Sequence, residues 1–175
     1  MIFSNDSNIF DLAVQNNWIY SEIKSDSSSI VRVVADENKM KCSWYLLIEK
    51  SAEIHSAKFI NYLVSYLENG DALGPDYRNV LTVTAKFSGE EMYHSHSTIK
   101  AIKRNGNLLY ASRSPIPFDG FAQSLQLLPI YGLRNHHFKP FSKDVKPGPL
   151  EISEKIEILR FIEQGVPVKI LHFEG

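Results

Sequence analysis

The chain has 175 residues, of which 43% are hydrophobic and 22% are charged, and its formal net charge at neutral pH is -1. This length favours one globular domain with a sizeable core, spanning residues 1–175, and the small net charge gives no electrostatic basis for binding nucleic acid or an anionic membrane. Because the sequence has a single cysteine, no signal-peptide pattern at its start and no apolar stretch of membrane-spanning length, we expect a cytoplasmic domain without internal disulfides.

The first part of the chain alternates short apolar runs with helical patterns. Residues 1–3 and 18–20 are expected to form strands, with one helix over 8–16 between them and another near 30–34. The run 43–48 is apolar throughout after its first residue, as in a strand at the centre of a parallel sheet. Strands that alternate with helices predict an α/β fold, in which helices cover both faces of a mostly parallel sheet.

The clearest helix is expected over residues 54–67, where apolar side chains recur at helical spacing. The side chains expected to face the sheet are Phe59, Ile60, Leu63, Val64 and Leu67. Gly70 ends this helix. The segment 80–85 then predicts a further strand, and its alternation of apolar and polar residues indicates that the strand is partly covered.

Four histidines allow two interpretations. They are His94, His96, His136 and His137. Two imidazoles spaced i, i+2 on a strand share one face, so a transition-metal site is conceivable. The sequence favours the other interpretation, in which all four are exposed loop residues without a ligand.

An Asn-Gly dipeptide predicts a hairpin between residues 98–103 and 107–112, because Asn105-Gly106 suits a type I′ turn. The hairpin leads into Ser-Arg-Ser-Pro-Ile-Pro at 112–117, where the two prolines exclude both a helix and a central strand. A guanidinium between two hydroxyls at a rigid strand exit suits an anionic ligand, since arginine binds carboxylate or phosphate through two parallel hydrogen bonds. An ion pair between Arg113 and a neighbouring acid is an equally good interpretation.

The last third of the chain predicts a strand near 125–131, one helix over 151–164 and a strand over 166–172. The buried stripe of this helix is expected to comprise Ile152, Ile156, Leu159, Phe161 and Ile162. Its carboxylates share one flank because they recur every third residue, at Glu151, Glu154 and Glu157. A row of this kind is usually a solvated face.

Three motifs occur in a fixed order: Ser-Arg-Ser-Pro-Ile-Pro from 112, Ile-Tyr-Gly-Leu-Arg from 130, and Pro-Leu-Glu from 149 before a Glu-rich helix. In this order they resemble the 3-deoxy-manno-octulosonate (Kdo) cytidylyltransferases, whose wider group includes the sialic-acid cytidylyltransferases. The resemblance implies a three-layer nucleotidyltransferase-like sheet with a β-hairpin arm, lacking the usual N-terminal strand. It also implies a cytidylyltransferase that uses CTP and a sugar acid such as Kdo, needs Mg²⁺ if active, and forms a homodimer through the hairpin region 98–134.

The resemblance further assigns a set of substrate-binding residues. They are Arg113, Ser114, Tyr131, Arg134, Glu151 and Glu154. It assigns no catalytic residue and no metal ligand, because several family positions have changed.

Lys50 stands where the family has a magnesium-binding Asp, and an ammonium cannot ligate magnesium. Leu127, Leu133 and Ile158 stand where the family has a His, a second aromatic residue and a Gln. The chain also begins after the family's triphosphate-binding loop and stops before its second metal-binding Asp. We therefore expect a cytidylyltransferase-like protein that is inactive or impaired as this chain. Three alternatives stay open: a fragment of a working enzyme, a diverged pseudoenzyme acting as a homodimer, and a sugar-binding or small-molecule-binding regulatory module.

Overall fold

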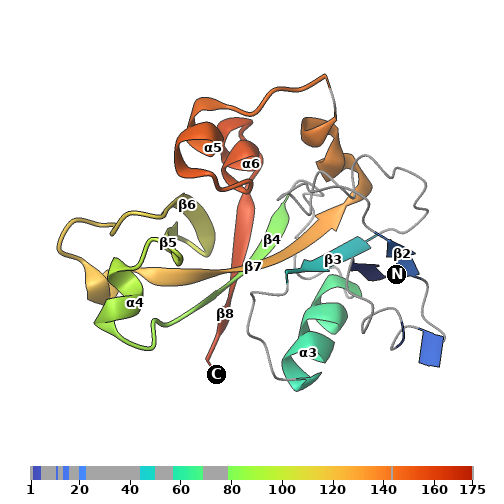
Figure 1. Cartoon of the computed structure of the whole chain (residues 1–175), viewed down its shortest axis with the longest axis horizontal. Coiled ribbons are helices and arrows are strands. Elements are labelled where there is room, and N and C mark those ends of the chain that lie inside the picture. Colours follow the sequence, from blue (N-terminus) through green and yellow to red (C-terminus); the bar gives the residue numbers. More distant parts are fainter. Residues whose placement is uncertain are drawn as a thin grey trace.

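The computed structural model shows a mixed β-sheet with helices against it (Figure 1). The structure describes residues 2–4, 11, 14–15, 20–22, 44–49, 57–68, 79–142 and 144–174. The helix predicted near 30–34 and the substituted position Lys50 lie outside these residues. None of the helices within the described ranges combines the length and the apolar character that crossing a bilayer requires.

The main sheet has six strands in the order β3-β7-β4-β8-β6-β5, and β5 also pairs with β7. The strands are β3 (Trp44–Ile48), β4 (Val80–Ala85), β5 (Ile99–Arg104), β6 (Asn107–Ser112), β7 (Leu125–Arg134) and β8 (Val168–Phe173). The predicted mostly parallel sheet is wrong, because β4 and β8 form the sole parallel pair among these strands. Strands joined by tight turns, such as β5 and β6, must run antiparallel, since a parallel pair needs a long crossover.

The N-terminal strands form a small sheet of their own. β1 (Ile2–Ser4) pairs in parallel with β2 (Tyr20–Glu22), so the predicted strands are confirmed with shifts of one to two residues. Asp11, Val14 and Gln15 are helical, as expected of the segment between them. Strand β3 was predicted to lie at the centre of a parallel sheet, whereas it pairs antiparallel with β7 at one end of the strand order.

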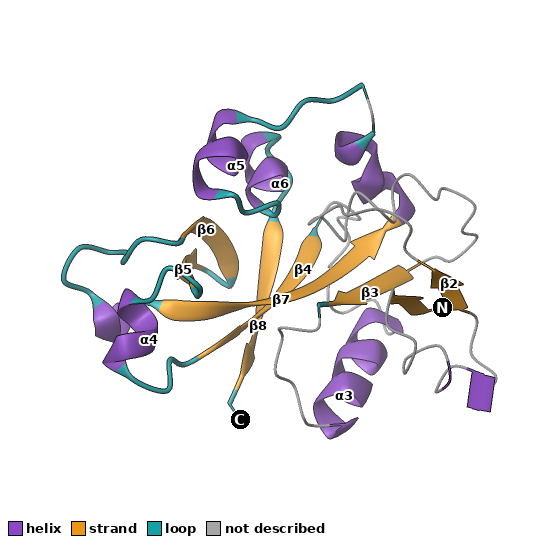
Figure 2. Cartoon of the chain, viewed as in Figure 1, coloured by secondary structure: helices purple, strands orange, loops and turns teal. Residues whose placement is uncertain are grey.

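Helices lie on both faces of the main sheet (Figures 1 and 2). α3 (Ala57–Glu68) packs Leu63 and Leu67 against Leu81 and Ile130. α5 (Pro149–Glu154) and α6 (Leu159–Glu163) lie against the opposite face. The core of that face contains Tyr45, Leu47, Tyr131, Leu133, Ile156, Leu159 and Phe161. Successive residues of β3 and β7 contribute to different cores because strand side chains alternate between faces.

Three predicted burial patterns are wrong in detail. Strand β4, predicted to be partly covered, is buried from Val80 to Thr84. Val64 of α3 is 38% exposed, so the face of α3 toward the sheet is narrower than the apolar pattern indicates. The single helix predicted over 151–164 is two short helices, because Lys155 adopts a left-handed conformation with φ 56° and ends α5. The chain then turns, which buries Ile156 and leaves Ile152 61% exposed.

Strand β7 contains a bulge that shapes the neighbouring pocket. Its register against β4 shifts between Thr82 and Val83, whose partners are Tyr131 and Leu128. Pro129 lies inside the skipped segment, where a missing N–H costs no ladder hydrogen bond. The Pro129 carbonyl accepts a 3.0 Å hydrogen bond from the amide of Glu49 just past β3, which fixes that residue beside the bulge.

The predicted hairpin is confirmed, with φ 52° at Asn105 and 75° at Gly106, as a type I′ turn requires. A Cβ at Gly106 would also lie 2.8 Å from Nζ of Lys169. We expect Gly106→Ala to lower the free energy of unfolding by about 1 kcal/mol, measured by urea denaturation. Gly89→Ala is the matched control, because Gly89 has extended backbone and open space around its Cβ. Equal effects of the two substitutions would contradict the strain assigned to Gly106.

Candidate functional site

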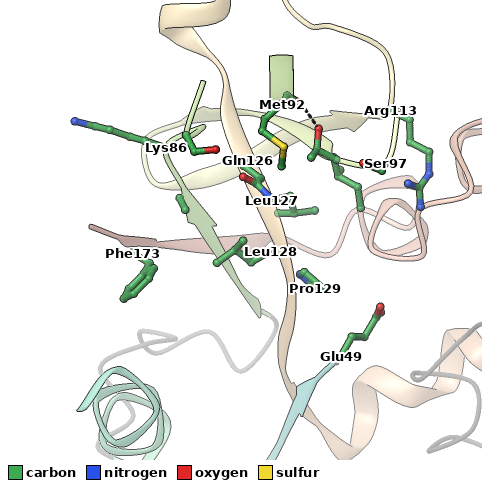
Figure 3. Close-up of a pocket in the computed structure, with 14 residues that line it drawn as sticks. Glu49, Lys86, Met92, Ser97, Arg113, Gln126, Leu127, Leu128, Pro129 and Phe173 are labelled. Atoms are coloured by element: carbon green, nitrogen blue, oxygen red, sulfur yellow. Dashed lines mark hydrogen bonds between the residues drawn. The ribbon is translucent and has the colours of Figure 1, made fainter. Parts of the chain in front are cut away.

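A pocket of about 450 Å³ opens where β3 and β6 end and β7 carries its bulge (Figure 3). The helix α4 (Glu90–His94) and the turn before β5 close one side of the pocket. The lining residues are Glu49, Ala85, Lys86, Ser88, Met92, Ser97, Thr98, Ile99, Arg113, Gln126, Leu127, Leu128, Pro129 and Phe173. The pocket therefore combines an apolar floor on β7 with a few charged and amide groups on its rim.

Arg113 and Glu49 are the two charged residues that lie on the same side of the pocket. In Figure 3, the Glu49 carboxylate points up from below and the Arg113 guanidinium points down on the same side of the pocket. The Lys86 ammonium extends away from both. Burial raises the pKa of Glu49, and the positive charge of Arg113 opposes that rise. The Arg113 guanidinium donates a 3.3 Å hydrogen bond from Nη1 to the carbonyl of His96, which leaves further donors for a ligand.

The Glu154 carboxylate holds the strand exit from which Arg113 projects. It accepts hydrogen bonds from the Tyr110 hydroxyl at 3.0 Å, the Ser112 hydroxyl at 2.9 Å and the Arg113 amide at 3.0 Å. Burial acts to raise the pKa of Glu154, but these hydrogen bonds and the charge of Arg113 outweigh it, so the pKa is lowered. Glu154 also raises the pKa of Tyr110, which burial raises further. The carboxylate is thus occupied by its own chain.

A lowered pKa makes Glu154 a source of pH-dependent stability. The ionised carboxylate contributes fully above the ordinary pKa of 4.5, and its contribution is lost as the pH falls through the lower pKa of the folded state. We expect the free energy of unfolding of the wild type to fall more steeply than that of Glu154→Gln below about pH 5. Urea denaturation between neutral and acidic pH measures this. Parallel profiles would contradict the assignment, and Glu90→Gln, at an exposed site, should give the wild-type slope.

Lys100 holds the backbone of Arg113 on its carbonyl side. Its side chain is fully buried, and Nζ donates to the carbonyls of Thr98 at 3.1 Å, Arg113 at 2.8 Å and Ser95. Burial lowers the pKa of this ammonium, and the charge of Arg113 lowers it further. All three ammonium hydrogens therefore have carbonyl acceptors.

Glu151, the other predicted carboxylate, lies in an ion pair away from the pocket lining. Arg160 donates to it from Nε at 2.5 Å and from Nη2 at 2.6 Å. Arg160 also donates from Nη1 to the Pro140 carbonyl at 2.8 Å, and its guanidinium lies 4.3 Å from the ring centroid of Phe141. This pair ties α5 to α6 and to the segment η3 (Asn135–Phe141).

The remaining predicted substrate residues do not line the pocket. Tyr131 is buried in the core, where burial raises the pKa of its hydroxyl and Glu49 adds to the rise. Arg134 stacks 3.9 Å above the centroid of the Trp44 ring, and its amide donates to Nδ1 of His137. Ser114 is exposed, and its amide donates to the Ser112 hydroxyl. Of the six predicted residues, the structure brings Arg113 into the pocket wall and places Glu154 behind it.

The histidines do not converge on one place. His94 ends α4 and lies within 3.9 Å of Glu90, and His96 is an exposed turn residue. His136 is exposed, whereas His137 is 2% exposed and stacks at its edge on His136, so the expectation of four exposed loop histidines is wrong at His137. No group of three or more His, Cys, Asp or Glu side chains that could hold a metal occurs within the described ranges.

Three of the four positions that depart from the family motifs lie in the apolar core. Leu127, Leu133 and Ile158 are all buried in one cluster, and Leu127 also reaches the pocket wall. A polar side chain at such a buried position would need a hydrogen-bond partner, whereas an aliphatic side chain packs there without one. The floor of the pocket is consequently apolar at Leu127.

Sequence reasoning missed Lys100 and Tyr110 as parts of the site, whereas it placed the Ser112 hydroxyl there beside Arg113. The one available signal was a lysine between two apolar residues of a predicted strand, Ile99 and Ala101. A strand lysine with that pattern normally points to solvent, so only the fold reveals that its ammonium is buried.

Comparison with known proteins finds that the chain is similar in sequence to cytidylyltransferases and in fold to several solved nucleotidyltransferases. No protein-family model matches the chain. Its sequence is 32% identical over 106 residues to the 3-deoxy-manno-octulosonate cytidylyltransferase of Rickettsia prowazekii (strain Madrid E), a match that covers 61% of this chain and 40% of that protein. The enzyme of the same name from Thermodesulfovibrio yellowstonii is 27% identical over 144 residues, covering 76% of this chain and 53% of the relative. The chain thus spans about half or less of the curated relatives it matches.

Two solved structures share the fold. The structure of CMP:2-keto-3-deoxy-manno-octonic acid synthetase complexed with CTP aligns with a TM-score of 0.77 at 20% identity, covering 99% of this chain and 71% of that one. The inositol-1-phosphate CTP transferase from T. maritima aligns with a TM-score of 0.54 at 12% identity, covering 98% of this chain and 64% of that one.

Proposed function

We propose that this chain, a diverged relative of the 3-deoxy-manno-octulosonate cytidylyltransferases, binds the sugar acid of a cytidylyl-transfer reaction in the pocket beside Arg113. The observation that carries the proposal is the placement of the Arg113 guanidinium and the half-buried Glu49 carboxylate on one side of an open pocket of about 450 Å³. A guanidinium matches the geometry of a carboxylate, which distinguishes a sugar acid from a neutral sugar.

Each part of the pocket has a role in this proposal. Arg113 binds the carboxylate of the acid, and Glu49 accepts hydrogen bonds from its hydroxyl groups. Leu127, Leu128 and Met92 pack against the carbon skeleton of the ligand. Sugars combine such apolar and hydroxyl surfaces, so a mixed wall suits them better than a uniformly polar one.

The transfer step itself would join a hydroxyl of the sugar acid to the α-phosphorus of CTP and release pyrophosphate. Charge neutralisation by a divalent ion normally supports such a step. The residues described here do not fit a magnesium site, because Glu49 is the one carboxylate of the pocket wall and Arg113 repels cations there. The proposed function therefore includes no metal-dependent step.

A second candidate is a protein that binds the acid without transferring a nucleotide. Leu127 and Ile158 support it, because both are core residues at positions where the family has polar groups near the substrate. Lys50, in place of a metal-binding Asp, points the same way on sequence.

Two measurements on the purified chain separate these candidates. Calorimetric titration with 3-deoxy-manno-octulosonate tests binding, and pyrophosphate release in the presence of CTP, the sugar acid and Mg²⁺ tests transfer. Binding together with pyrophosphate release above background supports the enzyme, and binding alone supports the second candidate. If the acid fails to bind at millimolar concentration, the proposed function is wrong.

We also propose that the hairpin region 98–134 mediates a homodimer, as the resemblance implies. The region exposes apolar side chains, with Phe118 98% exposed, and Leu109 and Phe121 beside it in the sequence are exposed as well. A second copy that covered them would remove apolar area from water. We expect light scattering to give the mass of a dimer and Phe118→Asp to shift it toward the monomer. The control is Tyr62→Asp on α3, which should leave the mass unchanged, and a wild-type monomer would contradict the proposal.

A further inference from the structure

The backbone of Arg113 is held at both its amide and its carbonyl by charged side chains. Its amide donates to the Glu154 carboxylate at 3.0 Å, and its carbonyl accepts from the Lys100 ammonium at 2.8 Å. Hydrogen bonds that involve a charged partner are about twice as strong as those between neutral groups.

Each of the two gripping side chains is anchored elsewhere. Lys100 lies on β5 and is fully buried, and its other two hydrogens go to the carbonyls of Ser95 and Thr98 in the turn before β5, which borders the pocket. Glu154 lies at the end of α5, and its other donors are the hydroxyls of Tyr110 and Ser112 on β6. The position of Arg113 is thus set by side chains of β5 and α5, two elements that are not adjacent to it in the sequence.

Neither side chain is among the residues that line the pocket. Lys100 has no hydrogen left to offer a ligand, and Glu154 already accepts three hydrogen bonds. These contacts leave neither group available for direct contact with a substrate. They instead fix the direction in which the Arg113 side chain leaves the backbone.

We propose that Lys100 and Glu154 are positioning residues. They clamp the backbone of Arg113 at its carbonyl and its amide, and thereby direct its guanidinium into the pocket, where it binds the carboxylate of the ligand. The inference rests on the proposed function for the identity of the ligand, but the clamp itself is a property of the chain. A preorganised guanidinium binds more tightly because less conformational freedom is lost on binding.

The test is a mutant cycle with 3-deoxy-manno-octulosonate as the probe. Lys100→Met and Glu154→Gln are each expected to weaken binding by about 10-fold or more, since each removes or weakens one of the two charged hydrogen-bond partners of the Arg113 backbone. In the Arg113→Ala background the same substitutions should change the affinity by less than about 2-fold, because the group they position is gone. A merely structural loss would weaken binding equally in both backgrounds. Lys103→Met, exposed on the same strand, and Glu90→Gln, exposed on α4, are the matched controls.

A second readout needs no ligand. The Arg113 side-chain Nε–H resonance should be resolved in the wild type and in both controls, and should move toward the position of a free arginine in Lys100→Met and Glu154→Gln. If the acid does not bind but this resonance responds as expected, the clamp stands and the proposed function fails. If the acid binds and both clamp variants keep the wild-type affinity and resonance, the clamp is wrong. Glu154→Gln alone decides the matter if Lys100→Met does not fold.

Discussion

Arg113→Ala is expected to abolish most of the affinity for 3-deoxy-manno-octulosonate, with a loss of about 100-fold or more. Two charge-assisted hydrogen bonds to a carboxylate are lost, each contributing about 1.5–3 kcal/mol when the donor is charged. The loss should be larger than for any other single substitution in the pocket wall, because the other cation there, Lys86, extends away from it. Calorimetric titration at constant ionic strength measures the affinity.

The control substitutions distinguish geometry from charge. Lys86→Ala removes the same charge from the same pocket wall and should reduce the affinity by less than about 3-fold, since a distant exposed charge is screened. Arg113→Lys keeps the charge but not the fork, so it should recover only part of the loss. An Arg113→Ala variant that binds as tightly as Lys86→Ala would refute the role of the guanidinium.

Glu151→Ala is expected to lower the free energy of unfolding by about 3–5 kcal/mol, the largest stability effect in the described part of the chain. Arg160 is 1% exposed and would keep a buried positive charge without its carboxylate partner. Its remaining contacts, to the Pro140 carbonyl and the Phe141 ring, do not neutralise that charge. The measurement is urea denaturation at neutral pH, with circular dichroism as the signal.

Removing both members of the pair should cost less than removing one. Glu151→Leu with Arg160→Met leaves no buried charge, so we expect this double variant to be more stable than Glu151→Ala. Glu90→Ala, at an exposed site of α4, is the control and should change the stability by less than about 0.5 kcal/mol. If the double variant is less stable than Glu151→Ala, the ion pair stabilises the fold by more than the neutralisation of the buried charge.

Local signals in the sequence predicted local structure well. The hairpin follows from Asn105-Gly106, and the strand β4 occupies the predicted residues 80–85. Helix α3 lies within its predicted range but for one residue at its end. The direction of the strands could not be predicted in this way, because it depends on which strands become neighbours. The break at Lys155 likewise has no local signal, since lysine rarely adopts a left-handed conformation.

The candidate site was predicted only in part, for a related reason. Arg113 was identified from its flanking serines and prolines, which are adjacent in the sequence, and it lines the pocket. Lys100 and Glu154 contact Arg113 from 13 and 41 positions away. Glu154 was assigned to the substrate by resemblance, and that assignment stays a prediction beside the three intramolecular hydrogen bonds the structure gives it.

The place of β8 in the strand order has a consequence for how the chain folds. β8 lies between β4 and β6, so the middle of the sheet closes only when the last described strand arrives from far along the chain. The β5–β6 hairpin can form alone within microseconds, whereas such non-local pairing takes milliseconds to seconds. Until β8 docks, β4 presents an unpaired edge, which makes the half-assembled chain prone to aggregate and a natural client for a chaperone.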